Sequence, residues 1–299
     1  MKVVYKNNSK KFSYTNNYYK GKCETFTDKI CYLKKTDYNN NLKTYCADKI
    51  NLRNYCKEKL NIDLCPKILK IYNNTNEITY NDLPEQFVLK CNHGSGMNII
   101  CDNKNLFDFD KNIKQLDYWN KINYTDFFKE GEEYHYDNIV KKIFVEEYLN
   151  IKNEYKVWCF NGIPKFVQGF FYDNLEKIIY KSVYKRQFSK HCVFVDKKFK
   201  MLKHKQFYIP RIGFREISYL KHYYKKLFFD EYNKLFEYAE KLAKDFIFVR
   251  VDFYLTNDDK IYLSELTFTP SAGYIQFNNI NTNLLFGSFL KLPENVKNN

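Results

Sequence analysis

A charged face on a predicted β-hairpin near residue 250 constrains this chain more than any other feature. Residues 248–255 read FVRVDFYL, and every second residue from Val249 to Leu255 is apolar, as in a strand with one buried face. The positions between them include Arg250 and Asp252. A second alternating run, IYLSELTF, follows after a short polar turn. These runs predict an antiparallel hairpin with one apolar and one charged face.

The register of this hairpin decides which charges meet. If residues 258–259 form a two-residue loop, Asp252 lies directly opposite Glu265. Strict alternation then places Leu263 on the same face as Glu265. Facing carboxylates about 5 Å apart repel each other, so the pair requires a cation. Mg²⁺ suits the pair because it takes oxygen ligands and is commonly held by one or two carboxylates.

The same register predicts that Arg250 lies opposite Thr267 on the charged face. A guanidinium beside a metal site can hold phosphate oxygens or a charged intermediate. The plain alternative is a solvent-facing strand side that carries charges without a ligand. The two alternatives differ in whether the charged residues lie together in the fold.

A second feature is a glycine-rich loop after the predicted strand at residues 85–90. The sequence VLKCNHGSG places Lys90 at the strand end and two glycines shortly after it. Glycines let backbone N–H groups approach an anion, and a lysine adds a positive charge. The order differs from a Walker A motif, in which the lysine follows the glycines. An ordinary turn remains the alternative.

The remaining pattern is of mixed type. No internal repeat of fixed period is visible. The segment 105–140 is predicted to be helical and irregular, and residues 176–215 have no clear assignment. Helices and strands are mixed without regular alternation, which predicts an α+β fold with largely antiparallel sheets. We expect helices at 41–60 and 229–246, and strands at 85–90, at 142–149 and on both sides of the turn Asn161–Gly162.

Composition bounds the partners and the compartment. The chain has 299 residues, 44% of them hydrophobic, which excludes a disordered protein. A net charge of +14 favours anionic partners such as nucleotides, acidic glycans or lipid headgroups. The nine cysteines form no Cys-x-x-Cys pair, which is typical of reduced thiols. No signal peptide or membrane-spanning stretch is visible, so we expect a cytoplasmic protein, with charge allowing peripheral membrane contact.

The order of these features resembles the ATP-grasp superfamily, and within it the TupA-like ATP-grasp family, which is associated with teichuronopeptide and other polysaccharide clusters. The resemblance spans roughly residues 45–293. It is carried by the segments DKINLRNY (48–55), LPEQFVLKCNHGSGMNIIC (83–101), VEEYL (145–149), EYKVWCFNGIPKF (154–166) and FVRVDFYLTNDDKIYLSELTFTPSAG (248–273).

The resemblance implies an ATP-grasp fold, in which two α+β subdomains with largely antiparallel sheets grip ATP between them. It implies an N-terminal region with an Asp-Lys helix, which would carry Lys49, at 1–82, a subdomain with the lysine and glycine loop at 83–149, and a subdomain with the metal hairpin at 150–293.

The resemblance also implies roles for residues around the phosphates. Lys49 and Lys90 would contact the phosphates of ATP, and Lys90 would share in catalysis. Gly94, Ser95 and Gly96 would form the loop that covers the phosphates.

For the nucleoside, the resemblance implies an adenine site lined by Glu146, Tyr148 and Leu149, partly through backbone hydrogen bonds. Glu154 would reach the ribose hydroxyls.

For the metal, the resemblance implies that Asp252 and Glu265 bind Mg²⁺ and that Arg250 steadies the transferred phosphate or the tetrahedral intermediate. Many ATP-grasp enzymes carry an asparagine ligand two residues after the metal glutamate, and this chain has Thr267 there. A hydroxyl is a weaker ligand than an amide carbonyl, so one metal is expected and a second is open. A further phosphate contact could come from Lys181, Lys185 or Arg186.

The implied activity is that of a carboxylate–amine ligase that acts through an acyl phosphate. Its substrates would be an acidic sugar or polysaccharide precursor and an amino acid or amine. A glycosyltransferase is one alternative, but its Asp-x-Asp metal motif is found only at Asp108 and Asp110, in a predicted surface loop. An ATP-dependent kinase and a nucleic-acid-binding module are the others, the last resting on charge and aromatic content. No nucleic acid is expected.

Overall fold

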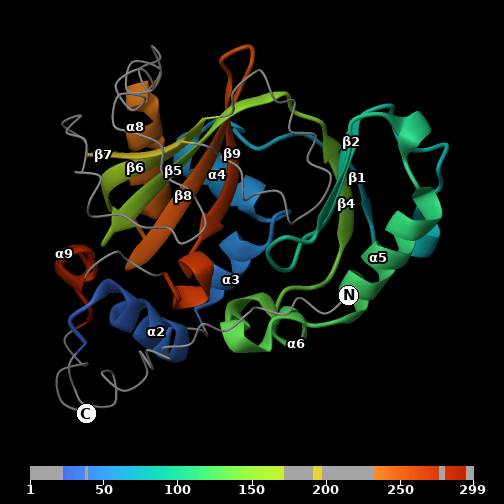
Figure 1. Cartoon of the computed structure of the whole chain (residues 1–299). Coiled ribbons are helices and arrows are strands. Elements are labelled where there is room, and N and C mark those ends of the chain that lie inside the picture. Colours follow the sequence, from blue (N-terminus) through green and yellow to red (C-terminus); the bar gives the residue numbers. More distant parts are fainter. Residues whose placement is uncertain (1–22, 38–39, 172–190, 197–231, 276–279, 294–299) are drawn as a thin grey trace.

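Two antiparallel sheets form the framework of the protein. The computed structural model describes residues 23–37, 40–171, 191–196, 232–275 and 280–293. One sheet has four strands and the other has five. Figure 1 shows the smaller sheet at one side of the molecule and the larger one at the other, joined by the chain that leaves β4 and enters β5. The architecture confirms the predicted α+β class.

The four-stranded sheet carries the lysine loop. Its strand order is β1-β4-β2-β3, with bounds Ile68–Tyr72, Ile143–Glu147, Phe87–Cys91 and Asn98–Cys101 in that order. The glycine loop therefore connects β2 to β3 as a hairpin. Helix α5, Phe109–Lys121, packs beside this sheet and buries Leu116 and Trp119 (Figure 1).

The five-stranded sheet carries the charged hairpin. Its order is β7-β6-β5-β8-β9, with bounds His191–Asp196, Ile163–Phe171, Ile151–Phe160, Phe248–Thr256 and Ile261–Thr267. Asn161 and Gly162 have φ values of 49° and 77°, as the predicted tight turn between β5 and β6 requires. Pairing of β5 with β8 brings the middle hairpin against the C-terminal one.

A hydrophobic core lies between this sheet and helix α8, Tyr232–Ala243. The helix buries Leu235, Phe236 and Ala239 against β5, β6 and β8, which confirms the predicted amphipathic helix. Phe229, at the start of the predicted helix, lies outside the described residues.

The other face of the five-stranded sheet has an aromatic cluster at one end. Helices α2, Phe26–Thr36, and α9, Ile280–Phe289, pack together there (Figure 1). Phe26 contacts the rings of Trp158 and Phe248. Thr25 and Asp28 form a capping box at the start of α2. This helix was not among the predicted elements.

The predicted helix at 41–60 is in fact two helices. Helix α3 spans Asn41–Ala47 and helix α4 spans Leu52–Leu60. The carboxylate of Asp48 accepts hydrogen bonds from the Ile50 backbone N–H at 2.8 Å and the Asn51 amide at 2.9 Å. Such local side-chain bonds compete with the helical bonds, so the helix ends here. The break places Lys49 in a turn that faces the glycine loop.

The segment 105–140 is helical and irregular, as predicted. Helix α6 spans Tyr124–Phe127. The described residues also include 3₁₀ turns, which are η1 at Thr75–Glu77, η2 at Lys104–Leu106, η3 at Lys129–Gly131 and η4 at Tyr134–Tyr136. The short segment η7, Pro270–Gly273, is irregular, since Ser271 and Ala272 have φ values of 52° and 54°.

Candidate active site

The charged hairpin contains the predicted residue pairs, but its turn is longer than predicted and one strand has a bulge. Asp252 lies opposite Glu265, and Arg250 lies opposite Thr267. Near the turn, however, Leu255 pairs with Ile261, so the connection is longer than the predicted two residues. A bulge then restores the register before the site is reached.

The bulge also changes which side chains share a face. Leu263 pairs with Phe253, and both are fully buried. Ser264 is the extra residue between the two registers. The prediction that Leu263 shares the face of Glu265 was therefore wrong, because strict alternation does not hold across a bulge. Without the bulge, Glu265 would not pair with Asp252.

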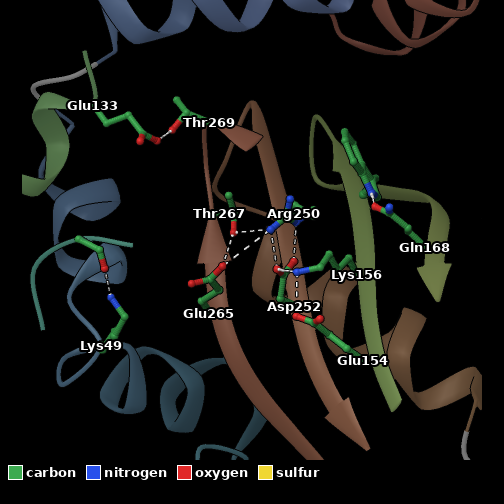
Figure 2. A network of polar contacts seen from close by, with 12 residues as sticks. Lys49, Glu133, Glu154, Lys156, Gln168, Arg250, Asp252, Glu265, Thr267 and Thr269 are labelled. Carbon is green, nitrogen blue, oxygen red and sulfur yellow. Dashed lines mark hydrogen bonds and ion pairs between the residues drawn. The ribbon is translucent and has the colours of Figure 1, made fainter. Parts of the chain in front are cut away.

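Asp252 is the centre of the site's charge network (Figure 2). Its side chain is 0% exposed. Arg250 donates to both carboxylate oxygens, from Nε at 2.7 Å and from Nη2 at 2.6 Å. Lys156 donates to Oδ2 at 2.8 Å. Two cations therefore balance a carboxylate that burial would otherwise disfavour.

Glu265 and Thr267 complete the charged face of the hairpin. Thr267 Oγ1 donates to Glu265 Oε1 at 3.1 Å and accepts from Arg250 Nη2 at 3.1 Å. Arg250 Nη2 lies 3.7 Å from Glu265 Oε1. Burial disfavours the guanidinium charge, but Asp252, Glu265 and Glu154 together outweigh it, so the pKa of Arg250 is raised. The residues predicted to bind metal and phosphate thus lie together.

Lys156 was missed by sequence reasoning. It lies on β5 opposite Asp252, and it also donates to Glu154 Oε1 at 2.8 Å. Across the sheet, Gln168 and Glu265 fall in the same row. The alternation of β5 placed Glu154 and Lys156 on one face, but nothing in the sequence showed that β5 would pair with β8. Glu154, which was predicted to contact the ribose, lies beside this row, because it is on β5 two residues before Lys156.

Lys49 meets the glycine loop from the turn between α3 and α4. Its Nζ donates to the carbonyl oxygen of Gly94 (Figure 2). Burial lowers the pKa of Lys49, Glu265 raises it and Lys90 lowers it further. The charges of Lys90 and Glu265 therefore both act on Lys49. The fold brings the two predicted phosphate lysines and the hairpin to one region.

The glycine loop itself has little room. Gly94 and Gly96 have φ values of 121° and 77°, which side chains disfavour. A Cβ on Gly94 would lie 2.3 Å from a ring carbon of Tyr124. Tyr124 also hydrogen-bonds with Ser95. The loop is held between Lys49 on one side and Tyr124 on the other.

Lys90 and Glu146 form an ion pair on neighbouring strands. Glu146 Oε2 also lies 4.0 Å from Arg53 Nη2. Tyr148 and Leu149 follow β4 in the connection to β5, and both are half-buried. The residues predicted for the adenine site therefore occupy the strand and connection that join the two sheets.

A buried carboxylate near this site has no sequence signal. Glu133 accepts hydrogen bonds from the hydroxyls of Thr269 and Tyr124. Its pKa is raised to about 7, mainly by burial and in part by the charge of Glu265, against the lowering effects of Thr269 and Lys34. The residue lies in the irregular segment before β4, where no periodicity could have predicted its position.

The Asp-x-Asp sequence is part of a helix start and not of the predicted surface loop. Asp108 caps α5 by accepting from the Lys111 backbone N–H at 3.2 Å, and Asp110 lies in the first turn. An N-cap and an acidic first turn stabilise a helix without any ligand.

Two further predictions concern other parts of the chain. Lys181, Lys185 and Arg186 lie outside the described residues. Within the described ranges, no helix is both long and apolar enough to cross a membrane.

Comparison with known proteins identifies the family of the chain. The sequence matches the model of the TupA-like ATP-grasp family over residues 28–210 and 203–291, which is most of the chain. The two-sheet fold with its lysine loop and charged hairpin is therefore an ATP-grasp fold. The chain belongs to the TupA-like ATP-grasp family, as its motifs predicted. Among curated proteins, none matches the chain.

Solved structures resemble the chain only distantly. The L-amino acid ligase from Bacillus licheniformis has a TM-score of 0.43 at 11% identity, over 76% of this chain and 44% of that one. The N5-carboxyaminoimidazole synthetase from Staphylococcus aureus, complexed with ADP, has 0.44 at 13%, over 83% and 53%. The D-alanine–D-alanine ligase from Bacillus anthracis, complexed with ATP, has 0.38 at 12%, over 81% and 63%. The chain spans less than two thirds of each.

Proposed function

We propose that this chain is an ATP- and Mg²⁺-dependent ligase that joins a carboxylate to an amine through an acyl phosphate. The observation that carries the proposal is the facing of Asp252 and Glu265 across β8 and β9, with Arg250 bonded between them. In a member of the ATP-grasp family, such a carboxylate pair beside phosphate-binding lysines suits a nucleotide-bound metal.

The donor atoms fit Mg²⁺. Asp252 and Glu265 supply carboxylate oxygens and Thr267 supplies a hydroxyl, all hard oxygen ligands. Among the described residues, no group of three or more His, Cys, Asp or Glu side chains is placed to hold a metal. Phosphate oxygens and water would supply the remaining ligands. Mg²⁺ bound there would neutralise the charge of the phosphates.

The chain's own cations would bind and orient the phosphates. Lys49 and Lys90 act on one another electrostatically; Lys49 contacts the glycine loop at Gly94, and Lys90 lies at the end of the strand that leads into it. Backbone N–H groups from Gly94 to Gly96 would cover the phosphates. Arg250 and Lys156 already hold Asp252, so both can transfer hydrogen bonds to phosphate oxygens.

The reaction needs no covalent bond to the protein. An oxygen of the substrate carboxylate attacks the terminal phosphorus, and the bond from that phosphorus to ADP breaks. The amine nitrogen then attacks the acyl carbon, and phosphate leaves with the electron pair of the carbon–oxygen bond. Arg250 would stabilise the negative charge that develops in both steps.

The acceptor proposed is an acidic sugar or a cell-surface polysaccharide precursor, and the donor an amino acid or amine. The net charge of +14 suits an acidic substrate. Glu146, Tyr148 and Leu149 are proposed to line the adenine site, and Glu154 to bind the ribose. A cytoplasmic location, with charge-mediated contact at a membrane surface, remains a prediction.

A phosphate-release screen tests the proposal. The protein is incubated with Mg²⁺–ATP and pairs of a uronic acid and an amino acid, and products are weighed by mass spectrometry. A ligase releases ADP and phosphate only with both substrates, and its product has the mass of the two substrates minus water. A phosphorylated sugar without phosphate release would mark a kinase, and AMP with pyrophosphate would reject the acyl-phosphate route.

A further inference from the structure

Glu133 is a buried side chain that is linked both to the end of the charged hairpin and to the glycine loop. It is 7% exposed, between η3 and η4. Thr269, two residues beyond Thr267, donates to its carboxylate, and so does Tyr124. Tyr124 in turn packs on the glycine loop. Glu133 therefore connects both halves of the candidate active site.

This carboxylate has no cationic partner among the described side chains. The ion pairs formed within the described ranges do not include Glu133, and its two donors are neutral hydroxyls. Lys34 is the cation that most lowers its pKa, but the Lys34 amino group donates to Ala272 O at 2.9 Å and pairs with Glu132 at 3.7 Å. A buried carboxylate is normally paired, so the site favours an external cation.

The position and the charge of Glu133 together indicate which substrate would supply that cation. Figure 2 shows Glu133 beside Thr269 and, like Lys49, on the side of Glu265 away from Asp252, and the charge of Glu265 acts on both residues. The carboxylate substrate and the phosphates are anions, which Glu133 repels. An amine is the one reactant of a carboxylate–amine ligase that arrives with a positive charge. Its ammonium group offers three N–H donors to an acceptor-only carboxylate.

We propose that Glu133 binds the ammonium group of the amine substrate and accepts its proton. This inference rests on the ligase function proposed above. One proton moves from nitrogen to a Glu133 oxygen, which frees the nitrogen lone pair. That pair forms the carbon–nitrogen bond, the bond from carbon to the phosphate oxygen breaks, and phosphate leaves with its electron pair. The second nitrogen proton passes to the departing phosphate.

The surroundings of Glu133 suit this proton transfer. Burial raises its pKa to about 7, so the group exchanges protons near neutral pH, and a bound ammonium would favour the ionised form. The titratable side chains that face it are Lys34 on α2, Lys43 on α3, Tyr124 on α6, Tyr136 on η4 and Glu265 on β9.

The test separates amine binding from formation of the acyl phosphate. Glu133→Gln keeps the shape and an acceptor for Thr269 but removes the charge. Wild type and variant are assayed with Mg²⁺–ATP and glucuronate or the uronic acid that reacts best, with glycine or hydroxylamine as nucleophile. Hydroxylamine is uncharged at pH 7.5 and needs no base. We expect hydroxamate formation within about twofold of wild type, and turnover with glycine reduced about 100-fold or more.

Two further readouts distinguish catalysis from a structural role. The Michaelis constant for glycine should rise at least about tenfold in Glu133→Gln, and the limb of the pH profile near 7 should disappear. Glu132→Gln is the matched control, since its side chain is 42% exposed and faces Lys34, and it should behave as wild type.

The outcomes are separable. Equal loss with both nucleophiles, or unchanged kinetics with glycine, would overturn the role of Glu133 and leave the ligase proposal standing. Failure of the wild type to form hydroxamate with any uronic acid would overturn the ligase proposal itself, and this inference with it.

Discussion

The charged hairpin and the glycine loop carry charge in different ways. On the hairpin, Asp252 is completely buried and bonded by Arg250 of the same strand and by Lys156 of the neighbouring strand β5. In the loop, Lys49 comes from a helix break and makes its bond to the backbone of Gly94. The hairpin is thus assembled by strand pairing, whereas the loop is held by contacts between distant segments.

This difference suggests different roles and different sensitivities. A charge network inside a sheet is rigid, so removal of its buried centre, Asp252, should cost stability, whereas removal of the partly exposed Glu265 should mainly cost catalysis. The glycine loop has two glycines at positive φ and is held in place by Lys49 and Tyr124, which come from other segments of the chain. Changes around the loop should alter nucleotide affinity more than stability.

The largest expected effect is on stability at the hairpin. Asp252→Ala would leave Arg250 and Lys156 buried without their common partner, and we expect a loss of about 3–5 kcal/mol in unfolding free energy. Urea denaturation measures it. Asp258→Ala, at the exposed tip of the same hairpin, should change little. Equal effects of the two substitutions would contradict the distinction between hairpin network and exposed charge.

The next effect is on catalysis at the same hairpin. Glu265→Ala should reduce ATP turnover about 100- to 1000-fold, because it removes one of two carboxylates expected to hold Mg²⁺. The unfolding transition should shift little, since Glu265 is bonded by Thr267 and is partly exposed. Circular dichroism and phosphate release check both statements. Full activity in this variant would sink the metal-site assignment.

A third effect concerns the residue that joins the two regions. Folding raises the pKa of Glu133 from an ordinary 4.5 to about 7, so this group contributes stability of about 3 kcal/mol below pH 4.5. The contribution is lost as the pH rises through 7, because the folded state holds the proton more tightly than the unfolded state. The difference in unfolding free energy between wild type and Glu133→Gln should therefore change between pH 4.5 and 8. A constant difference would contradict the raised pKa.

The smallest effect is expected at the loop side. Lys90→Met should raise the Michaelis constant for ATP about 10- to 100-fold through loss of a charged hydrogen bond. Glu146 would keep Arg53 at 4.0 Å as a partner, so the fold should persist. Lys70→Met on the exposed strand β1 is the control and should leave the constant unchanged. If Lys90→Met lost as much unfolding free energy as Asp252→Ala, the proposed difference between the hairpin and the loop would be wrong.

Much of the fold could be predicted because its signals are local. The alternation in β8, the turn at Asn161–Gly162 and the apolar stripe of α8 each lie within one element. The break at Asp48 was missed because a side chain outcompeted the helical bonds over only a few residues. Helix α2 was missed although Phe26, Ile30 and Leu33 follow helical spacing, because the helix is short and its partners are far along the chain.

The candidate site was predicted as far as its residues lie within recognisable motifs. Lys156 could not be assigned, since its partner Asp252 is 96 residues away. Glu133 could not be assigned either, because Thr269 and Tyr124 reach it from separate segments. Its pKa depends on burial, which the sequence does not show.

The charged hairpin shows which features follow from the sequence alone and which depend on the tertiary structure. The sequence by itself determined that Arg250, Asp252, Glu265 and Thr267 belong to two paired strands, because alternation and turn residues are local properties. Only the tertiary structure decided how they meet, since a longer turn and a bulge compensate one another. It also decided their charge balance, because Lys156 arrives from β5 through a strand pairing formed over long range.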